Sequence, residues 1–173
     1  MDTNHGGVCL FHHNSLKVSR LSVTSYSTFE TVCTRISGHQ LTAATVAVVY
    51  RPGSRSTTGL FFDEFADLLE RIAVTSSPVI IAGDLNVHLD IVDDPAAIKL
   101  SDILNTYGLT QHITQPTHDC ARTLDVLITR SDQIVDSINV DTPLLSDHSL
   151  LVAGVNIHLS TKYTVSRLAV TGR

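Results

Sequence analysis

Two stretches of the chain carry apolar residues at helical spacing, and most of the rest consists of short apolar or alternating runs. Residues 60–74 place charged residues between regularly recurring apolar ones, which predicts an amphipathic helix. Residues 96–107 repeat the pattern and stop at Gly108, which predicts a second helix. Strands are predicted over 8–11, 17–23, 28–36, 41–50, 79–82, 109–114, 124–129, 134–140 and 149–159. This succession of strands and helices predicts a layered α/β arrangement.

The apolar strand predicted at 79–82 ends abruptly in polar residues. Gly83 lets the chain bend there, and Asp84 and Asn86 lie two residues apart, so they project to the same side. Ligands in layered α/β folds gather at such carboxyl ends. The segment is therefore a candidate reaction centre. Taken alone it is equally well explained as a capped turn, because Asp and Asn are common turn residues.

Two later segments also combine polar groups with apolar runs. Asp125 lies within the apolar strand predicted at 124–129, where an unpaired charge is costly to bury. The polar tetrad 146–149 precedes the next apolar run and contains His148, which is the candidate partner of Asp125. A carboxylate beside an imidazole favours the imidazolium form, which suits the stabilisation of negative charge. Singly, such residues are more often structural.

In this order, the three segments resemble the motifs of the endonuclease/exonuclease/phosphatase superfamily. Its late motifs are a Gly-Asp-x-Asn turn, a Leu-Asp strand and a Ser-Asp-His turn, and the run 46–53 resembles its strand that ends in Tyr-x-Pro. Phe29, Glu30 and the stretch 117–125 are most similar to the endonuclease domain of non-LTR retrotransposons. The resemblance implies an α/β four-layer sandwich of the deoxyribonuclease-like type, in which helices flank two packed, mixed β-sheets.

The resemblance further implies Mg²⁺-dependent hydrolysis of phosphodiester bonds, with Mn²⁺ as the alternative ion and DNA as the partner. It assigns roles to six residues, which are Tyr50, Asp84, Asn86, Asp125, Asp147 and His148. Asp84 would orient or deprotonate the attacking water, while Tyr50 and Asn86 would contact the phosphate. His148, held by Asp125, would also contact the phosphate, and Asp147 would lie near the metal. These roles require one pocket, with Asp84 within about 15 Å of His148.

The family's first strands carry an Asn and the Glu that holds the metal, and nothing before Gly6 matches them, since the acidic residue there, Asp2, is not in a matching motif. We therefore expect a partial domain over 1–159 with its first strands missing, followed by a frayed tail over 160–173. Loss of that Glu makes a catalytically impaired remnant the alternative to a DNA-nicking enzyme. A third hypothesis, action on a phosphoinositide or sphingolipid headgroup, would need an apolar loop facing a membrane, and the sequence shows none.

Composition narrows these hypotheses only slightly. The chain has 173 residues, with 12 Lys and Arg against 17 Asp and Glu, and its net charge of −5 argues mildly against a broad basic face for DNA. Four arginines either form a local basic rim or are scattered, and both interpretations stay open for Arg51, Arg55, Arg122 and Arg130.

The remaining features indicate a protein of an intracellular compartment, nuclear or cytoplasmic. Three widely separated cysteines form neither a disulfide framework nor a zinc motif, and there is no apolar run of about 18 residues or signal peptide. No membrane association or protein partner is indicated. Glu30 is expected to be peripheral, and the histidines without a shared ligand spacing are expected on the surface or in loops: His12, His13, His88, His112, His118 and His158.

Overall fold

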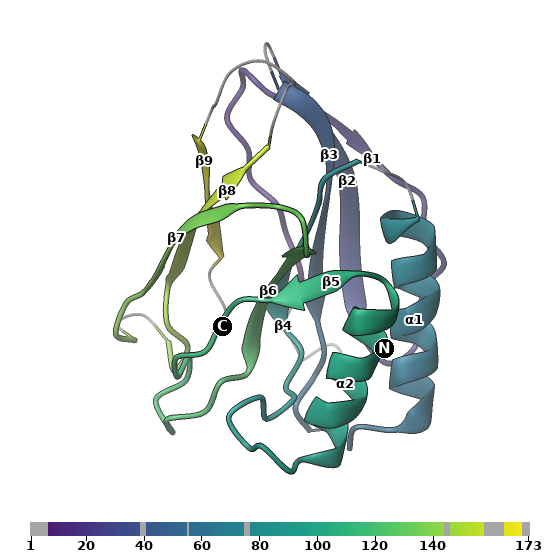
Figure 1. Cartoon of the computed structure of the whole chain (residues 1–173), viewed down its shortest axis with the longest axis vertical. Coiled ribbons are helices and arrows are strands. Elements are labelled where there is room, and N and C mark those ends of the chain that lie inside the picture. The colour runs from purple at the N-terminus through teal and green to yellow at the C-terminus, as the bar shows by residue number, and fades with distance from the viewer. Residues whose placement is uncertain are drawn as a thin grey trace.

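A computed structural model describes residues 7–38, 41–54, 56–74, 77–143, 146–157 and 165–170. In these ranges two helices accompany two packed β-sheets (Figure 1). The helices are α1 (Gly59–Ala73) and α2 (Pro95–Thr106). The strands are β1 (Lys17–Arg20), β2 (Glu30–Gly38), β3 (Leu41–Tyr50), β4 (Val79–Asp84), β5 (Leu109–Gln111), β6 (Asp125–Arg130), β7 (Val135–Val140), β8 (Leu151–Asn156) and β9 (Val165–Val170).

The larger sheet has six strands in the order β1-β2-β3-β4-β6-β5. Only β3 and β4 pair in parallel, because α1 connects them as a crossover. Both helices cover the outer face of this sheet (Figure 1). Their apolar faces and the sheet form one core, in which Phe61, Phe65 and Leu68 are almost completely buried. Because the apolar face of α1 packs on the sheet, the helix brings β4 beside β3, and the two strands end at the same edge.

The smaller sheet has the order β7-β8-β9 and packs against the other face of the larger one (Figure 1). Strands β3, β4, β6 and β8 contribute the second core, which includes Val46, Ile80, Leu127 and Val155. The predicted α/β sandwich with two packed sheets and flanking helices is confirmed. In the described part of the chain the helices lie on one outer face, and the smaller sheet is antiparallel rather than mixed.

Two segments differ from their predictions. Residues 8–11 form no strand, and Phe11 is 93% exposed, because the run has no neighbouring strand with which to pair. Residues 165–170, predicted as part of a frayed tail, instead form β9 along the edge of β8, where unpaired backbone groups are available. His39, in the predicted hairpin turn, lies outside the described residues. Neither described helix is long and apolar enough to cross a bilayer.

Candidate active site

Three adjacent strands of the larger sheet bring polar residues to the same end. Tyr50, the last residue of β3, is in register with Asp84, the last residue of β4, and Asp84 is in register with Asp125, the first residue of β6. Side chains alternate along a strand, so Asp84 shares a face with Ile80, which belongs to the core between the sheets. Asp84 and Asp125 are both buried. The two carboxylates therefore lie at one end of the core between the sheets.

His148 reaches these carboxylates from the loop between β7 and β8. Its Nδ1 atom lies 2.8 Å from Oδ2 of Asp125, and its Nε2 atom lies 3.8 Å from Oδ2 of Asp84. The His148 side chain is only 7% exposed. The predicted roles require Asp84 within about 15 Å of His148, and the 3.8 Å between their side-chain atoms lies well inside that limit. The structure brings together residues from both sheets that are far apart along the chain.

The turn after β4 is held in a fixed shape. Gly83 has a φ of 136°, and a Cβ atom there would collide with the backbone of Val49. Asn86, with a φ of 50°, donates its backbone N–H to Oδ1 of Asp84 over 2.8 Å and its side-chain amide to Oδ2 over 2.7 Å. The buried Arg51 side chain donates to the carbonyl of Leu85 over 2.6 Å. These bonds fix the Asp84 carboxylate, and they fit the capped-turn interpretation as well as the catalytic one.

Burial and neighbouring charges shift the pKa values of the cluster. Burial, and next the charge of Asp125, raise the pKa of Asp84 to about 6, against the lowering effects of the Asn86 N–H, His148 and Arg51. The hydrogen bond with Asp125 raises the pKa of His148, although burial opposes it. Above about pH 6 the Asp84 carboxylate can therefore accept a proton, and the raised pKa of His148 favours the imidazolium, which can stabilise an anion.

Tyr50 lies at the edge of this cluster. Burial raises the pKa of its hydroxyl, and the charges of Asp84 and Glu30 add to that effect. The phenol therefore stays protonated at neutral pH and can donate a hydrogen bond. Glu30 is exposed and in register with Tyr50 at the start of β2, and its peripheral role stays a prediction.

A second loop packs against the loop of His148. Thr117 is buried, and its hydroxyl oxygen accepts hydrogen bonds from the backbone N–H groups of Leu124 and Asp125 over 3.1 and 3.2 Å. Its carbonyl accepts the N–H of Ser149 over 2.8 Å, and the N–H of Asp119 donates to the carbonyl of Asp147 over 2.9 Å. The loop of residues 117–119 is therefore bonded both to the start of β6 and to the Ser-Asp-His segment.

This pairing places His118 beside the cluster, which the sequence interpretation missed. The ring of His118 meets the ring of His148 edge to face, with centroids 4.8 Å apart, and its Nε2 atom lies 3.4 Å from Oδ2 of Asp147. The side chain is 17% exposed. His118 does lie in a loop, as expected, but it belongs to the site. Only the preceding Thr117, in a stretch that resembles the retrotransposon endonucleases, hinted at this.

Of the predicted arginines, the three that the structure describes do not form a shared exposed rim, and Arg51 lies beside the turn after β4. Arg51 is buried and lies over the ring of Phe61, while Arg122 pairs with Asp90 over 2.9 Å and Arg130 is 3.4 Å from Asp132. Arg55 lies outside the described residues. Of the other histidines, His12, His13 and His88 are exposed as expected, His112 is partly buried, and His158 lies outside the described residues.

The cluster offers few oxygen ligands for Mg²⁺, which prefers six oxygens. In the described part of the chain, Asp84 and Asp125 are already tied to Asn86 and His148, whereas Asp147 is 54% exposed. The groups of side chains there that could hold an ion both include His118, one with Asp119 and Cys120 and the other with Asp147 and His148. These donors suit a transition metal better than Mg²⁺. The described residues thus do not form a magnesium site by themselves.

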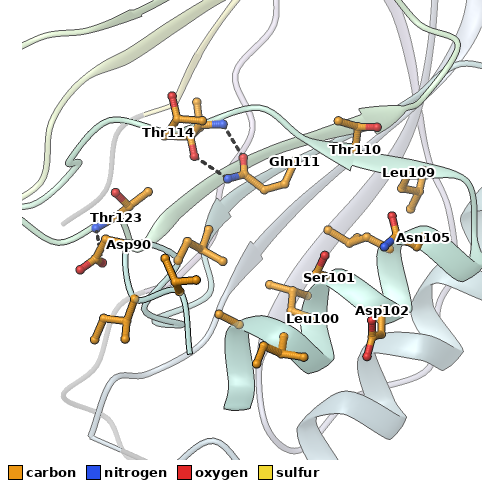
Figure 2. Close-up of a pocket in the computed structure, with 17 residues that line it drawn as sticks. Asp90, Leu100, Ser101, Asp102, Asn105, Leu109, Thr110, Gln111, Thr114 and Thr123 are labelled. Atoms are coloured by element: carbon orange, nitrogen blue, oxygen red, sulfur yellow. Dashed lines mark hydrogen bonds between the residues drawn. The ribbon is translucent and has the colours of Figure 1, made fainter. Parts of the chain in front are cut away.

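A separate pocket of about 690 Å³ lies between the loop at residues 89–92, α2 and β5 (Figure 2). None of the six predicted site residues lines it. Two of its polar side chains have partners within the protein, because Asp90 accepts the N–H of Thr123 over 3.0 Å and the Gln111 amide donates to the carbonyl of Ile113 over 2.6 Å.

The model of the Endonuclease/Exonuclease/phosphatase family matches residues 1–148, a range that includes the strands β3, β4 and β6 and ends at His148. No curated protein matches the chain.

Proposed function

Because the chain belongs to the endonuclease/exonuclease/phosphatase family, we propose that it is a DNA-nicking endonuclease of a retrotransposon. The family's general reaction is metal-dependent hydrolysis of phosphodiester bonds. The observation that supports a hydrolase most directly is the contact of His148 with both Asp125 and Asp84. DNA as the substrate rests on the resemblance of the segments at 29–30 and 117–125 to retrotransposon endonucleases.

Asp84 and His148 supply complementary chemistry for this reaction. Asp84 takes a proton from the attacking water, whose oxygen then bonds to phosphorus while the bond to the leaving sugar oxygen breaks. His148 donates from Nε2 to a phosphoryl oxygen and stabilises the charge that develops there, since Asp125 holds its other nitrogen. Tyr50 donates its hydroxyl to the phosphate. Asn86 fixes the Asp84 carboxylate, and its side-chain amide contacts the phosphate by releasing either Asp84 or the carbonyl of Arg51.

A divalent ion, when bound, neutralises phosphate charge and assists the leaving oxygen. Mg²⁺, with Mn²⁺ as the alternative, stays a prediction of the family resemblance, and so does the role of Asp147 near that ion. The scarcity of oxygen ligands around His148 among the described residues favours a second candidate function, which is a catalytically impaired remnant of the same domain. Both hypotheses assume the same fold, and they differ in whether the chain hydrolyses phosphodiester bonds at a measurable rate.

Plasmid nicking separates them. The purified chain should convert supercoiled plasmid to open circles in the presence of Mg²⁺ or Mn²⁺, and Asp84→Ala and His148→Ala should abolish that conversion. His13→Ala, at an exposed histidine away from the cluster, is the matched control and should nick normally. Plasmid that stays supercoiled with folded protein and either ion would establish the remnant, and nicking by both cluster variants would overturn the proposed site. A reverse-transcriptase frame downstream in the genome tests the retrotransposon origin.

A further inference from the structure

Three side chains with metal-binding atoms converge at the mouth of the cluster. One ligand atom each from His118, Asp147 and His148 lies within 4.8 Å of the others. The rings of the two histidines meet edge to face at 83°, and Nε2 of His118 lies 3.4 Å from Oδ2 of Asp147. Two imidazole nitrogens and one carboxylate oxygen make a donor set typical of zinc and related transition metals.

Both histidines have a carboxylate at the nitrogen that faces away from this space. Nδ1 of His148 contacts Asp125, and Nδ1 of His118 lies 2.9 Å from Oδ1 of Asp119 and accepts the backbone N–H of Cys120 over 3.1 Å. An ion on Nε2 of His118 moves the ring proton to Nδ1, where Asp119 accepts it and the bond from the Cys120 N–H is given up. Metal-binding histidines commonly donate their other N–H to a carboxylate in this way. The arrangement occurs twice in this one site.

Backbone bonds hold the ligands in place before any ion arrives. His118 and His148 form an isolated antiparallel bridge, and the bonds from Ser149 to Thr117 and from Asp119 to Asp147 flank it. Little conformational entropy is therefore lost on binding.

The surroundings of the three ligands suit a cation that enters from solvent. Asp147 and His118 are 54% and 17% exposed, whereas His148 forms the buried wall at 7%. Oδ2 of Asp84 lies behind that wall, 3.8 Å from Nε2 of His148. Asp119 and Asp125 add negative charge at the far nitrogens of the two imidazoles, which favours a cation between the rings and Asp147.

We propose that His118, Asp147 and His148 bind a transition-metal dication of the zinc type, with water completing a tetrahedral set. The ion occupies Nε2 of His148, the atom that the proposed function assigns to the phosphate. Zinc at this site therefore inhibits cleavage of DNA, and this second part rests on the proposed function.

The binding test uses Zn²⁺ as the probe, on the whole chain and without DNA. Calorimetry should give one high-affinity zinc per chain, insensitive to excess Mg²⁺, and the imidazole NMR signals of His118 and His148 should shift. His118→Asn removes a ligand, so its affinity for zinc should fall by more than the roughly 10- to 100-fold typical of losing a residue that only supports a ligand. Asp119→Asn removes such a supporting residue, and its affinity for zinc should fall about 10-fold. The exposed Asp147→Asn should also weaken binding, which covers the case in which the histidine variant folds poorly.

Matched controls and a second readout keep the outcomes distinct. Cys120→Ser, His13→Asn and Asp132→Asn should bind zinc like the unmodified chain, and full affinity in His118→Asn, or loss in Cys120→Ser, would overturn the site. Zinc should slow plasmid nicking by the unmodified chain. The His118→Asn variant should need at least about 10-fold more zinc to lose the same fraction of its own zinc-free nicking rate. Nicking without zinc binding contradicts this inference alone, and zinc binding without nicking contradicts only the proposed function.

Discussion

Nδ1 of His148 lies 2.8 Å from Oδ2 of Asp125, and this contact joins the two sheets at the candidate active site. Asp125 begins β6 of the larger sheet, and His148 lies in the loop before β8 of the smaller one. Both side chains are buried. The contact fixes the ring so that Nε2 faces Asp84, and the protonation of the two residues is therefore linked.

Asp125→Asn should lower the pKa of His148. The substitution keeps a similar shape and a carbonyl acceptor, but it removes the charge that favours the imidazolium. Protonated His148 contributes its full stability to the fold below the ordinary histidine pKa, and this contribution is lost as the pH rises through the raised pKa of His148. Because that pKa is lower in the variant, the variant loses the contribution at a lower pH than the unmodified chain. NMR titration of the His148 ring checks the shift. An unchanged pKa would show that Asp125 does not hold the proton on His148.

Asp84→Asn should abolish cleavage without destabilising the fold. The pKa of Asp84 is raised from about 4 to about 6, so its carboxylate opposes folding increasingly as the pH rises through that window, and fully above it. About two pKa units correspond to a ceiling of about 3 kcal/mol. Because the new amide has one oxygen, it can accept only one of the two bonds from Asn86, and the net gain at neutral pH should be about 1 kcal/mol.

Urea unfolding of both proteins at about pH 8 and about pH 4 tests this gain, which should be present at the higher pH and nearly absent at the lower. A loss of stability at about pH 8 would mean that the charged form of Asp84 supports the fold.

The rate of cleavage should depend on pH as a bell. The acid limb should lie near pH 6, where Asp84 takes up a proton and can no longer accept one from water. The alkaline limb should lie above the ordinary histidine value of 6.5, because the pKa of His148 is raised. Single-turnover nicking rates across the range measure both limbs. A rate that stays level through pH 5–7 argues against Asp84 as the base.

Thr117→Val should destabilise the protein by about 2 kcal/mol. The hydroxyl of this buried residue accepts two backbone N–H groups, from Leu124 and Asp125, and valine leaves both without that acceptor. Urea unfolding measures the loss. Thr114→Val, at an exposed position, is the matched control and should change stability by less than about 0.5 kcal/mol. Equal effects at both positions would remove Thr117 from this structural role.

Gly83→Ala should prevent folding or cost at least about 3 kcal/mol. The backbone there has a φ of 136°, and the added methyl would meet the carbonyl of Val49 on the paired strand. Gly59→Ala, at the first position of α1 with open space around it, should leave stability unchanged or slightly higher. The yield of folded protein and urea unfolding compare the two. Similar stability in both variants would show that β4 can shift away from β3.

Most of the fold could be predicted because its periodicity is local. The helix predicted at 60–74 is observed at Gly59–Ala73, since one face is buried and the other is charged. Strand alternation likewise places Asp84 and Asp125 on the same face as the core residues that precede or follow them. The strand predicted at 109–114 ends at Gln111, whose side chain bonds the backbone of Ile113 in place of a sheet partner.

The parts that escaped prediction depend on contacts between distant segments. His118 acquires its place from backbone bonds between residues 117–119 and 147–149, and no spacing along the chain signals those bonds. The run at 8–11 is apolar but has no strand beside it, whereas residues 165–170 have a weaker pattern but find the edge of β8. A local pattern indicates what a segment can form, and pairing decides whether it does.

A double-mutant cycle on Asp84 and His148 tests the central claim most directly, because residues that act as one unit lose activity non-additively. Single-turnover nicking would be measured for the unmodified chain, Asp84→Asn, His148→Ala and the double variant. We predict losses of at least about 100-fold for each single variant and no further loss in the double variant. Three results would contradict a shared reaction centre. They are losses that multiply in the double variant, single variants that nick at the unmodified rate, and an unmodified chain that does not nick at all.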